Sequence, residues 1–127
     1  MMHWIALGIA SLVALAIIAI GIQYIAAPRT ATRSFGLPLP ENGTSISWWL
    51  RLKGVRDIAS GLTVLSLMAW GTPRVVGIVL FAEAVIPVGD MLVVLGGKGS
   101  TKAAFGMHGI TAVVMVLTAI ALIMGVR

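Results

Sequence analysis

Seven ionisable side chains interrupt stretches of sequence that are otherwise apolar. They are Arg51, Lys53, Arg56, Asp57, Glu83, Asp90 and His108. Such a group costs about 2.5–3.5 kcal/mol at the centre of a membrane helix, so by default it indicates function. Carboxylates and histidine can exchange protons with a ligand, and arginine or lysine can hold its polar or anionic end. The three basic and three acidic groups also cancel, as mutual pairing in a low-dielectric site requires.

The spacing within residues 48–70 brings two of these groups together with two glycines. Lys53 and Asp57 are four residues apart and can pair on one helix face. Gly54 and Gly61 flank Asp57 on nearly the same face, where a missing side chain lets a neighbouring helix approach closely. We predict helix packing as the role of both glycines.

The acids within residues 73–96 also share a helix face. Glu83, Pro87 and Asp90 follow the i, i+4, i+7 pattern, and the proline could kink the helix between them. Gln23 and His108 lie in the two remaining apolar stretches. At a rise of about 1.5 Å per residue, all these groups fall in the middle or in one half of the membrane. Four helices would thus each present a polar group to one inner pocket.

We predict two roles for this constellation. The candidate catalytic residues are Asp57, Glu83, Asp90 and His108, and the candidate ligand-binding residues are Gln23, Arg51, Lys53 and Arg56. Simpler explanations stay open. Arg51 and Lys53 can extend to the lipid headgroups. Asp57 paired with a basic neighbour can serve helix packing, and His108 can be a satisfied, non-catalytic histidine. Glu83 is the hardest to explain in this way, because it lies deep and must be paired, protonated or hydrated.

Several other chemistries are excluded or disfavoured. The sequence has no cysteine, which excludes disulfides, thiolate nucleophiles and zinc–thiolate sites. One histidine with three carboxylates could hold a divalent ion, but the neighbouring cations oppose it and no spaced ligand motif is present. The glycine-rich run at 96–100 lacks the spacing of a phosphate loop. We therefore expect no metal, no cofactor and, without a basic stripe on a polar face, no nucleic-acid partner.

Composition indicates the class of protein. The chain has 127 residues, 59% of them hydrophobic and only 10% charged, whereas a soluble domain carries about 25% charged residues. A water-soluble domain is therefore nearly excluded, and the lipid bilayer is the expected environment. Four apolar stretches of membrane-spanning length lie at roughly 4–26, 48–70, 73–96 and 103–126. We predict one all-α domain, 1–127, that forms a polytopic bundle of four transmembrane helices.

The distribution of basic residues predicts the orientation in an inner or plasma membrane. Four spans put both termini on one side, together with Arg74 and Arg127. The other side has seven basic residues: Arg29, Arg33, Arg51, Lys53, Arg56, Lys98 and Lys102. By the positive-inside rule, the long connection 28–47 is cytoplasmic and both termini face outward. The prolines and glycines of that connection predict an irregular loop.

One stretch resembles a known family. Residues 51–62 read Arg-Leu-Lys-Gly-Val-Arg-Asp-Ile-Ala-Ser-Gly-Leu, and an acid in the third span and His108-Gly109 in the fourth follow them. The pattern resembles the family called domain of unknown function 4267, small four-span membrane proteins of bacteria and fungi, and more loosely the DoxX-like four-helix membrane proteins. The resemblance implies a four-helix membrane bundle and supplies no activity. It also implies a shared site made of Arg51, Lys53, Gly54, Arg56, Asp57 and Gly61.

Three functions fit these residues. In the first, a small lipophilic or anionic ligand reaches the pocket from the cytoplasmic side, and the titratable groups catalyse an isomerisation or cyclisation without a cofactor. In the second, Glu83 carries protons in a small-molecule transporter that works as a homo-oligomer, although the apolar outer half disfavours transport. In the third, the charge cluster only fixes helix register in a structural or accessory subunit. The sequence leaves open whether the chain is an enzyme.

Overall fold

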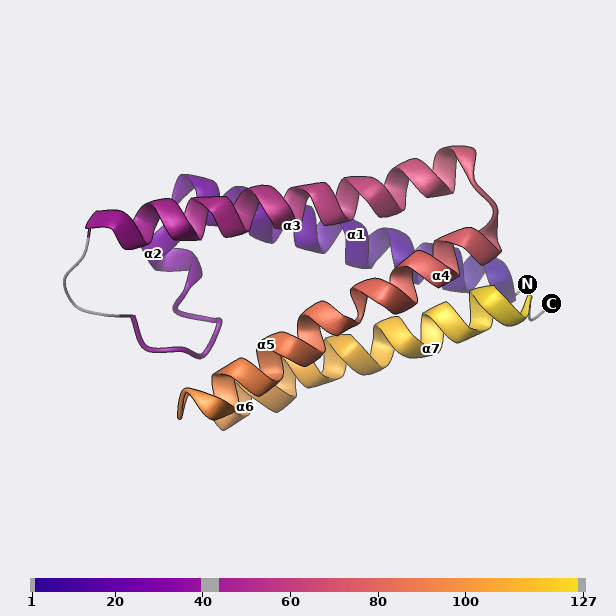
Figure 1. Cartoon of the computed structure of the whole chain (residues 1–127). Coiled ribbons are helices and arrows are strands. Elements are labelled where there is room, and N and C mark those ends of the chain that lie inside the picture. Colours follow the sequence, from indigo (N-terminus) through magenta and orange to yellow (C-terminus); the bar gives the residue numbers. More distant parts are fainter. Residues whose placement is uncertain (1, 40–43, 126–127) are drawn as a thin grey trace.

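The computed structural model describes residues 2–39 and 44–125, and every regular element in these ranges is a helix. The elements are α1 (Met2–Ala26), α2 (Pro28–Ala31), α3 (Thr44–Trp70), α4 (Pro73–Glu83), α5 (Val85–Gly96), α6 (Thr101–Ala103), the π-helical η1 (Ala104–Gly109) and α7 (Ile110–Met124) (Figure 1). The predicted all-helical class is confirmed. Val126, the last residue of the predicted span 103–126, lies outside the described residues, as do both ends of the predicted domain 1–127.

Three helical stretches are long and apolar enough to cross a membrane: α1, α4 with α5, and α6 through α7. Helix α3 has 27 residues, about 40 Å at 1.5 Å per residue, but four charged side chains lie in its first half. Large apolar side chains cover the outside of the bundle, and Leu12, Val85 and Leu117 are 69%, 70% and 64% exposed. Such a surface is unfavourable in water and suits the hydrocarbon of a bilayer.

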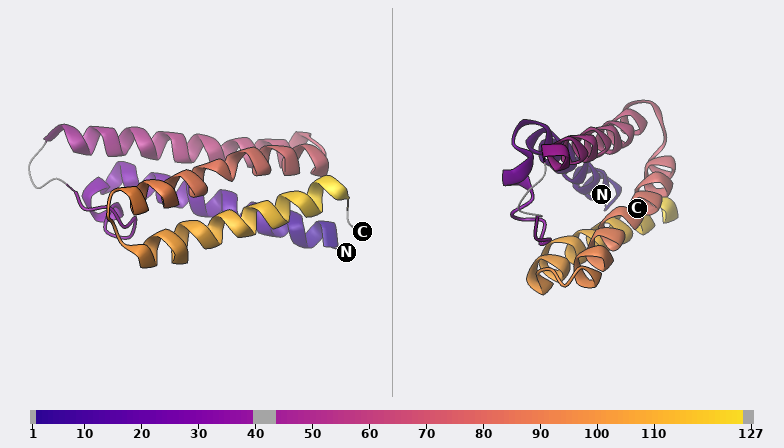
Figure 2. Two further views of the ribbon diagram at one scale, coloured as in Figure 1. Left: turned by 60° about the horizontal axis from the view of Figure 1, so that its bottom comes forward. Right: turned by 60° about the vertical axis from the view of Figure 1, so that its left-hand side comes forward.

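The helices form two antiparallel pairs. Helix α1 packs along α3, and α4 packs along α7 (Figures 1 and 2). The pairs meet at the end that holds both termini, which we call the terminal end, and α1 contacts α4 and α7 there. They diverge toward the opposite end, the loop end, where no described Cα atom of α5 comes within 8 Å of α3.

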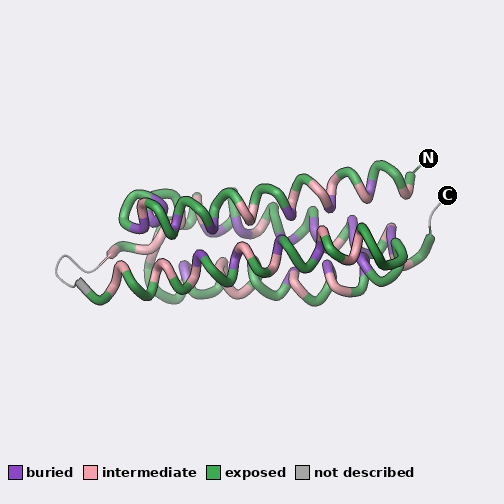
Figure 3. Tube along the Cα trace, turned by 90° about the horizontal axis from the view of Figure 1, so that it is seen from above, coloured by how far each residue is buried: buried purple, intermediate pink, exposed green. Residues whose placement is uncertain are grey.

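The hydrophobic core is built largely from small residues of α1 and larger ones of the other helices. It contains Ala6, Ala10, Ala14, Val64, Val76, Leu80, Ala84, Met115, Ala119 and Leu122. Buried residues follow the inward sides of the helices, and the outward sides are exposed (Figure 3). The core therefore closes the bundle toward the terminal end and leaves the loop end splayed.

Glycines let α1 and α3 approach each other closely. A Cβ atom added to Gly54 would lie 2.5 Å from the carbonyl oxygen of Gly21, and one added to Gly61 would lie 2.5 Å from that of Ala14. Both distances are far shorter than an ordinary van der Waals contact, so only glycine fits at these two positions. The face of α3 that carries them also carries Asp57, which is buried.

Two departures from α-helical geometry accompany the splay. The stretch 73–96 is broken at Ala84, three residues before Pro87, whose ring nitrogen cannot donate to the carbonyl of Glu83. Segment η1, which packs against α5, is a turn of π-helix with His108 near its end. Turns of π-helix are rare in proteins, and those that occur are often found at functional sites.

The connection after α1 is more regular than the sequence predicts. An irregular loop is expected over 28–47, but Pro28–Ala31 forms a helical turn and α3 begins at Thr44. The fixed φ angle of Pro28 suits the first position of a helix, which explains the turn. The segment that follows runs back across the loop end, where the backbone N–H of Ser100 donates to the carbonyl of Gly36 at 2.8 Å.

Candidate functional site

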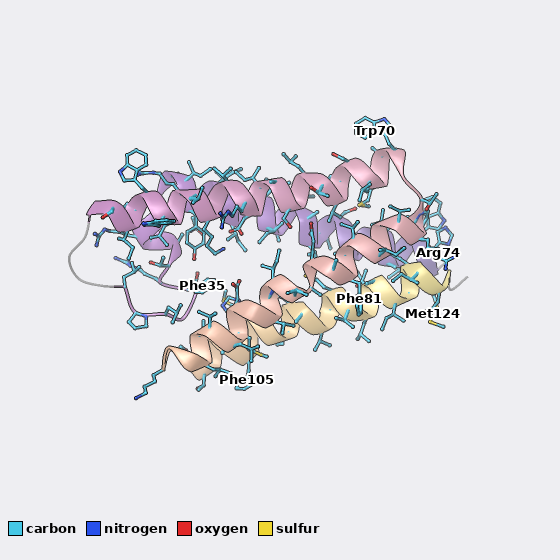
Figure 4. All side chains as sticks on the ribbon, in the orientation of Figure 1. Phe35, Trp70, Arg74, Phe81, Phe105 and Met124 are labelled. Carbon is cyan, nitrogen blue, oxygen red and sulfur yellow. The ribbon has the colours of Figure 1, made fainter. Side chains whose placement is uncertain are left out.

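A cavity of about 530 Å³ lies between the two helix pairs on the loop side of the core. Apolar side chains form most of its wall: Ile9, Leu12, Val13, Ile17, Ile20, Val64, Ile86, Pro87, Met107, Val114 and Met115. Phe35 lies between the two helix pairs and closes part of the loop end, whereas Trp70 and Phe105 point away from the bundle (Figure 4). The cavity is thus a lipophilic chamber with few polar groups.

The first polar group is an ion pair on α3. The Nζ atom of Lys53 donates to Oδ2 of Asp57 at 2.6 Å, one helical turn away. The same ammonium lies 4.5 Å from the ring centre of Tyr24 and 5.4 Å from that of Phe35, which are cation–π distances. Asp57 is 6% exposed, so this pairing is what neutralises a buried carboxylate. Lys53 lines the cavity, and Asp57 reaches it only through Lys53.

The second polar group joins η1 to the segment after α2 and to α5. The Nε2 atom of His108 lies 2.9 Å from the carbonyl oxygen of Phe35, and the two rings meet edge to face at 4.7 Å. The Nδ1 atom lies 3.8 Å from Oδ2 of Asp90. Because a carbonyl oxygen only accepts, Nε2 must carry a hydrogen, and a neutral ring then presents the lone pair of Nδ1 to the carboxyl group. Both His108 and Asp90 line the cavity, and Nδ1 faces the carboxyl group at 3.8 Å, beyond direct hydrogen-bond distance.

The third polar group lies deeper, toward the middle of the helices. The hydroxyl of Ser60 donates to Oε2 of Glu83 at 2.8 Å, which links α3 to α4. Both residues line the cavity. Within the described ranges, no basic side chain makes an ion pair with Glu83. Its carboxyl group therefore rests on one neutral hydrogen bond in a mostly apolar surrounding.

The other predicted ligand-binding residues are placed differently. The Nε atom of Arg51 donates to the carbonyl of Ile25 at 3.1 Å, and the guanidinium stacks on Trp48 at 4.8 Å from its ring centre. Arg56 is exposed, and neither arginine lines the cavity. Gln23 is largely exposed and lines the cavity rim. The structure therefore brings Lys53, Glu83, Asp90 and His108 to the cavity, and it places both arginines outside it.

Sequence reasoning missed several residues of the site. Tyr24, Ser34, Phe35 and Ser60 all line the cavity. A signal existed for Ser60, which follows Asp57 by three residues and shares its helix face. No signal existed for the contact of His108 with the carbonyl of Phe35, because a backbone carbonyl in a loop has no sequence signature. Within the described residues, no three His, Asp or Glu side chains come together so that they could hold a metal ion.

The comparisons with known proteins identify one family. A family model described as Domain of unknown function (DUF4267) matches residues 14–122, which include every cavity-lining group named above as polar. This match confirms the resemblance that residues 51–62 indicate. No curated protein and no solved structure matches the chain.

Proposed function

This chain belongs to the DUF4267 family, and we propose that it is a four-helix integral membrane protein that binds a small lipophilic ligand between its helix pairs. The observation that carries the proposal is the cavity of about 530 Å³, with apolar walls and three polar groups. Ligand sites are typically clefts of about 300–1,000 Å³ that are mostly apolar and have a few convergent polar groups. The cavity has the size and the lining that this class of site requires.

The proposal makes α3 the fourth membrane span. A hydrocarbon layer of about 30 Å takes about 20 residues, which reach back from Trp70 to near Leu50. Arg51 then lies at the boundary and Arg56 about 9 Å inside it, within reach of the headgroups for a long side chain. The exposed position of Arg56 and the pairing of Lys53 with Asp57 both support this placement.

The loop end is proposed to be cytoplasmic, with both termini outside. Arg29, Arg33, Lys98 and Lys102 lie in the connecting segments and short helices at this end, and Arg74 lies at the terminal end (Figure 4). A majority of basic residues marks the cytoplasmic side. The cavity would then extend from the middle of the bilayer into its cytoplasmic half, where a ligand can approach from the inner leaflet past exposed wall residues such as Ile20.

The polar groups favour a lipophilic ligand over an anionic one. Both arginines that could hold an anion lie outside the cavity, and Lys53 is already paired with Asp57. The polar end of the ligand would lie against the polar groups of the cavity wall, and its apolar body would lie against the walls of α1 and α7.

The pair of His108 and Asp90 supports acid–base chemistry on that ligand. In an isomerisation or cyclisation, the pair would give a proton to one atom of the ligand, and a base would take a proton from another atom. Glu83, two helical turns or about 10 Å from Asp90, is positioned to act as that base. No cofactor is needed, because the protons given and taken balance.

Proton-linked transport and a structural role are the alternatives. A transporter would also need a path to the terminal end, where Ala10, Ala119 and Leu122 are buried in the close-packed core. Opening such a path requires α1 and α7 to separate. The closed core therefore favours a binding or catalytic site over transport.

Adjacent valines of α7 provide a matched test of the cavity. Val114 lines it, and Val113 does not and is 58% exposed. The probe is N-phenyl-1-naphthylamine, a neutral lipophilic fluorophore, titrated into protein in lipid nanodiscs with empty nanodiscs subtracted. We expect saturable binding to the natural protein and to Val113→Trp, and at least tenfold weaker binding to Val114→Trp, whose indole fills the cavity. Equal binding to all three would show simple partition into lipid and would contradict the proposal.

A further inference from the structure

The charged groups that line the cavity do not all have a partner of opposite charge, and one acidic side chain is left over. Lys53 forms an ion pair with Asp57 at 2.6 Å, and the carboxyl group of Asp90 faces Nδ1 of His108 at 3.8 Å. Glu83 is left over, with the hydroxyl of Ser60 as its hydrogen-bond donor. Once the partners are assigned, the described cavity wall carries one acidic group that no cation balances.

The apolar surroundings of Glu83 favour two states of its carboxyl group, one with a bound proton and one paired with a cation. A carboxylate among apolar side chains is costly unless it binds a proton or a cation. None of the described residues supplies a cation to it: Arg56 lies on the exposed side of α3, and Lys53 lies almost two turns away from Ser60 along that helix. The helix break adds to the negative character nearby, since Pro87 leaves the carbonyl of Glu83 without its usual donor four residues on.

We infer that the cavity selects lipophilic cations, such as protonated amines or onium compounds, whose positive charge pairs with Glu83. This inference rests on the proposed binding function and names its ligand class. The cation would lie beside the Ser60–Glu83 hydrogen bond, and its hydrocarbon groups would fill the apolar chamber formed by Ile17, Val64 and Met115. An anion of the same shape would meet the carboxyl groups of Glu83 and Asp90 without a free basic partner.

Two ions of nearly the same shape and opposite charge test the inference. Tetraphenylphosphonium and tetraphenylborate are titrated into the full chain in nanodiscs of zwitterionic lipid, with empty nanodiscs and Val114→Trp nanodiscs as blanks. We expect saturable binding of the phosphonium at least tenfold tighter than that of the borate. Equal affinities, or tighter binding of the borate, would overturn the inference.

Substitutions at Glu83 separate its charge from its shape. Glu83→Gln keeps the size and the hydrogen-bond acceptor, and we expect it to weaken phosphonium binding at least tenfold. Glu83→Asp retains the charge and should keep most of the affinity. Binding of the neutral naphthylamine to each variant, within about twofold of the natural protein, shows that the cavity is intact.

The outcomes distinguish the two proposals. If the natural protein binds the neutral probe but does not prefer the cation, or if Glu83→Gln binds the phosphonium normally, the charge selection is wrong and the binding function stands. If the natural protein binds neither the neutral probe nor the phosphonium, both proposals fail together.

Discussion

Replacing Gly54 with alanine tests how closely α1 and α3 approach. The added Cβ atom would lie 2.5 Å from the carbonyl oxygen of Gly21 and 3.0 Å from the Cβ atom of Tyr24. Ordinary contact begins at 3.4 Å, so the two helices would have to separate by about 1 Å or shift along each other. The Cγ1 atom of Ile25, also at 3.0 Å, can move, but the nearest group is a backbone carbonyl, so no side-chain rotation can relieve that clash.

The cost follows from this geometry. Inserting a carbon into a well-packed interface costs about 1–3 kcal/mol. Exchanging glycine for alanine inside a helix returns about 0.5–1 kcal/mol in water. Gly8→Ala is the matched control, since a Cβ atom at Gly8 meets nothing within 4 Å. The intrinsic gain is common to both variants, so their difference in the free energy of unfolding isolates the packing cost, about 1–3 kcal/mol.

Reversible unfolding in mixed micelles, followed by far-ultraviolet circular dichroism, measures this difference. Gly54→Ala should unfold at a lower denaturant fraction than Gly8→Ala, and Gly61→Ala should behave like Gly54→Ala because its Cβ atom would meet the carbonyl of Ala14 at the same 2.5 Å. If Gly54→Ala and Gly8→Ala were equally stable, the close approach of α1 and α3 would be refuted.

Three further predictions concern single side chains. Lys53→Met leaves the buried Asp57 without its cation and should lower the free energy of unfolding by about 3 kcal/mol, whereas Lys53→Met with Asp57→Asn should recover most of the loss in the same unfolding experiment. His108→Leu removes the donor to the carbonyl of Phe35 at a cost of about 1–3 kcal/mol, so amide hydrogen exchange around Phe35 should be faster than in His108→Gln, which retains a donor; equal rates would contradict the hydrogen bond. Arg56→Gln should bind tetraphenylphosphonium within about twofold of the natural protein, and a larger change would mean that Arg56 reaches the cavity after all.

The helices and the membrane environment follow from local properties of the sequence. Runs of apolar residues with few charges predict helices in hydrocarbon, because no other open backbone conformation satisfies its own hydrogen bonds there. The pairing of Lys53 with Asp57 is equally local, since four residues make one helical turn and the spacing alone brings the two side chains together. The position of the helix break is local too, because Pro87 cannot donate a hydrogen bond wherever the helix packs.

Only part of the candidate site follows from local spacing in the sequence. Sequence periodicity groups residues on helix faces, but it does not say how far each helix is rotated about its axis in the bundle. That rotation is set by contacts such as Gly54 against Gly21, and it turns Arg56 outward while Ser60 faces Glu83. The partner of Glu83 could therefore not be read from its own helix.

The amino-acid sequence by itself determined the class of protein, the helical backbone and the contacts within one turn of a helix, because each depends on neighbours along the chain. Only the tertiary structure decided that the two helix pairs splay at the loop end, that the carbonyl of Phe35 orients His108 toward Asp90, and that Glu83 is left without a cation among the described residues. These features join residues up to 73 positions apart. They depend on how whole helices rotate and diverge to pack their small residues, which no local spacing specifies.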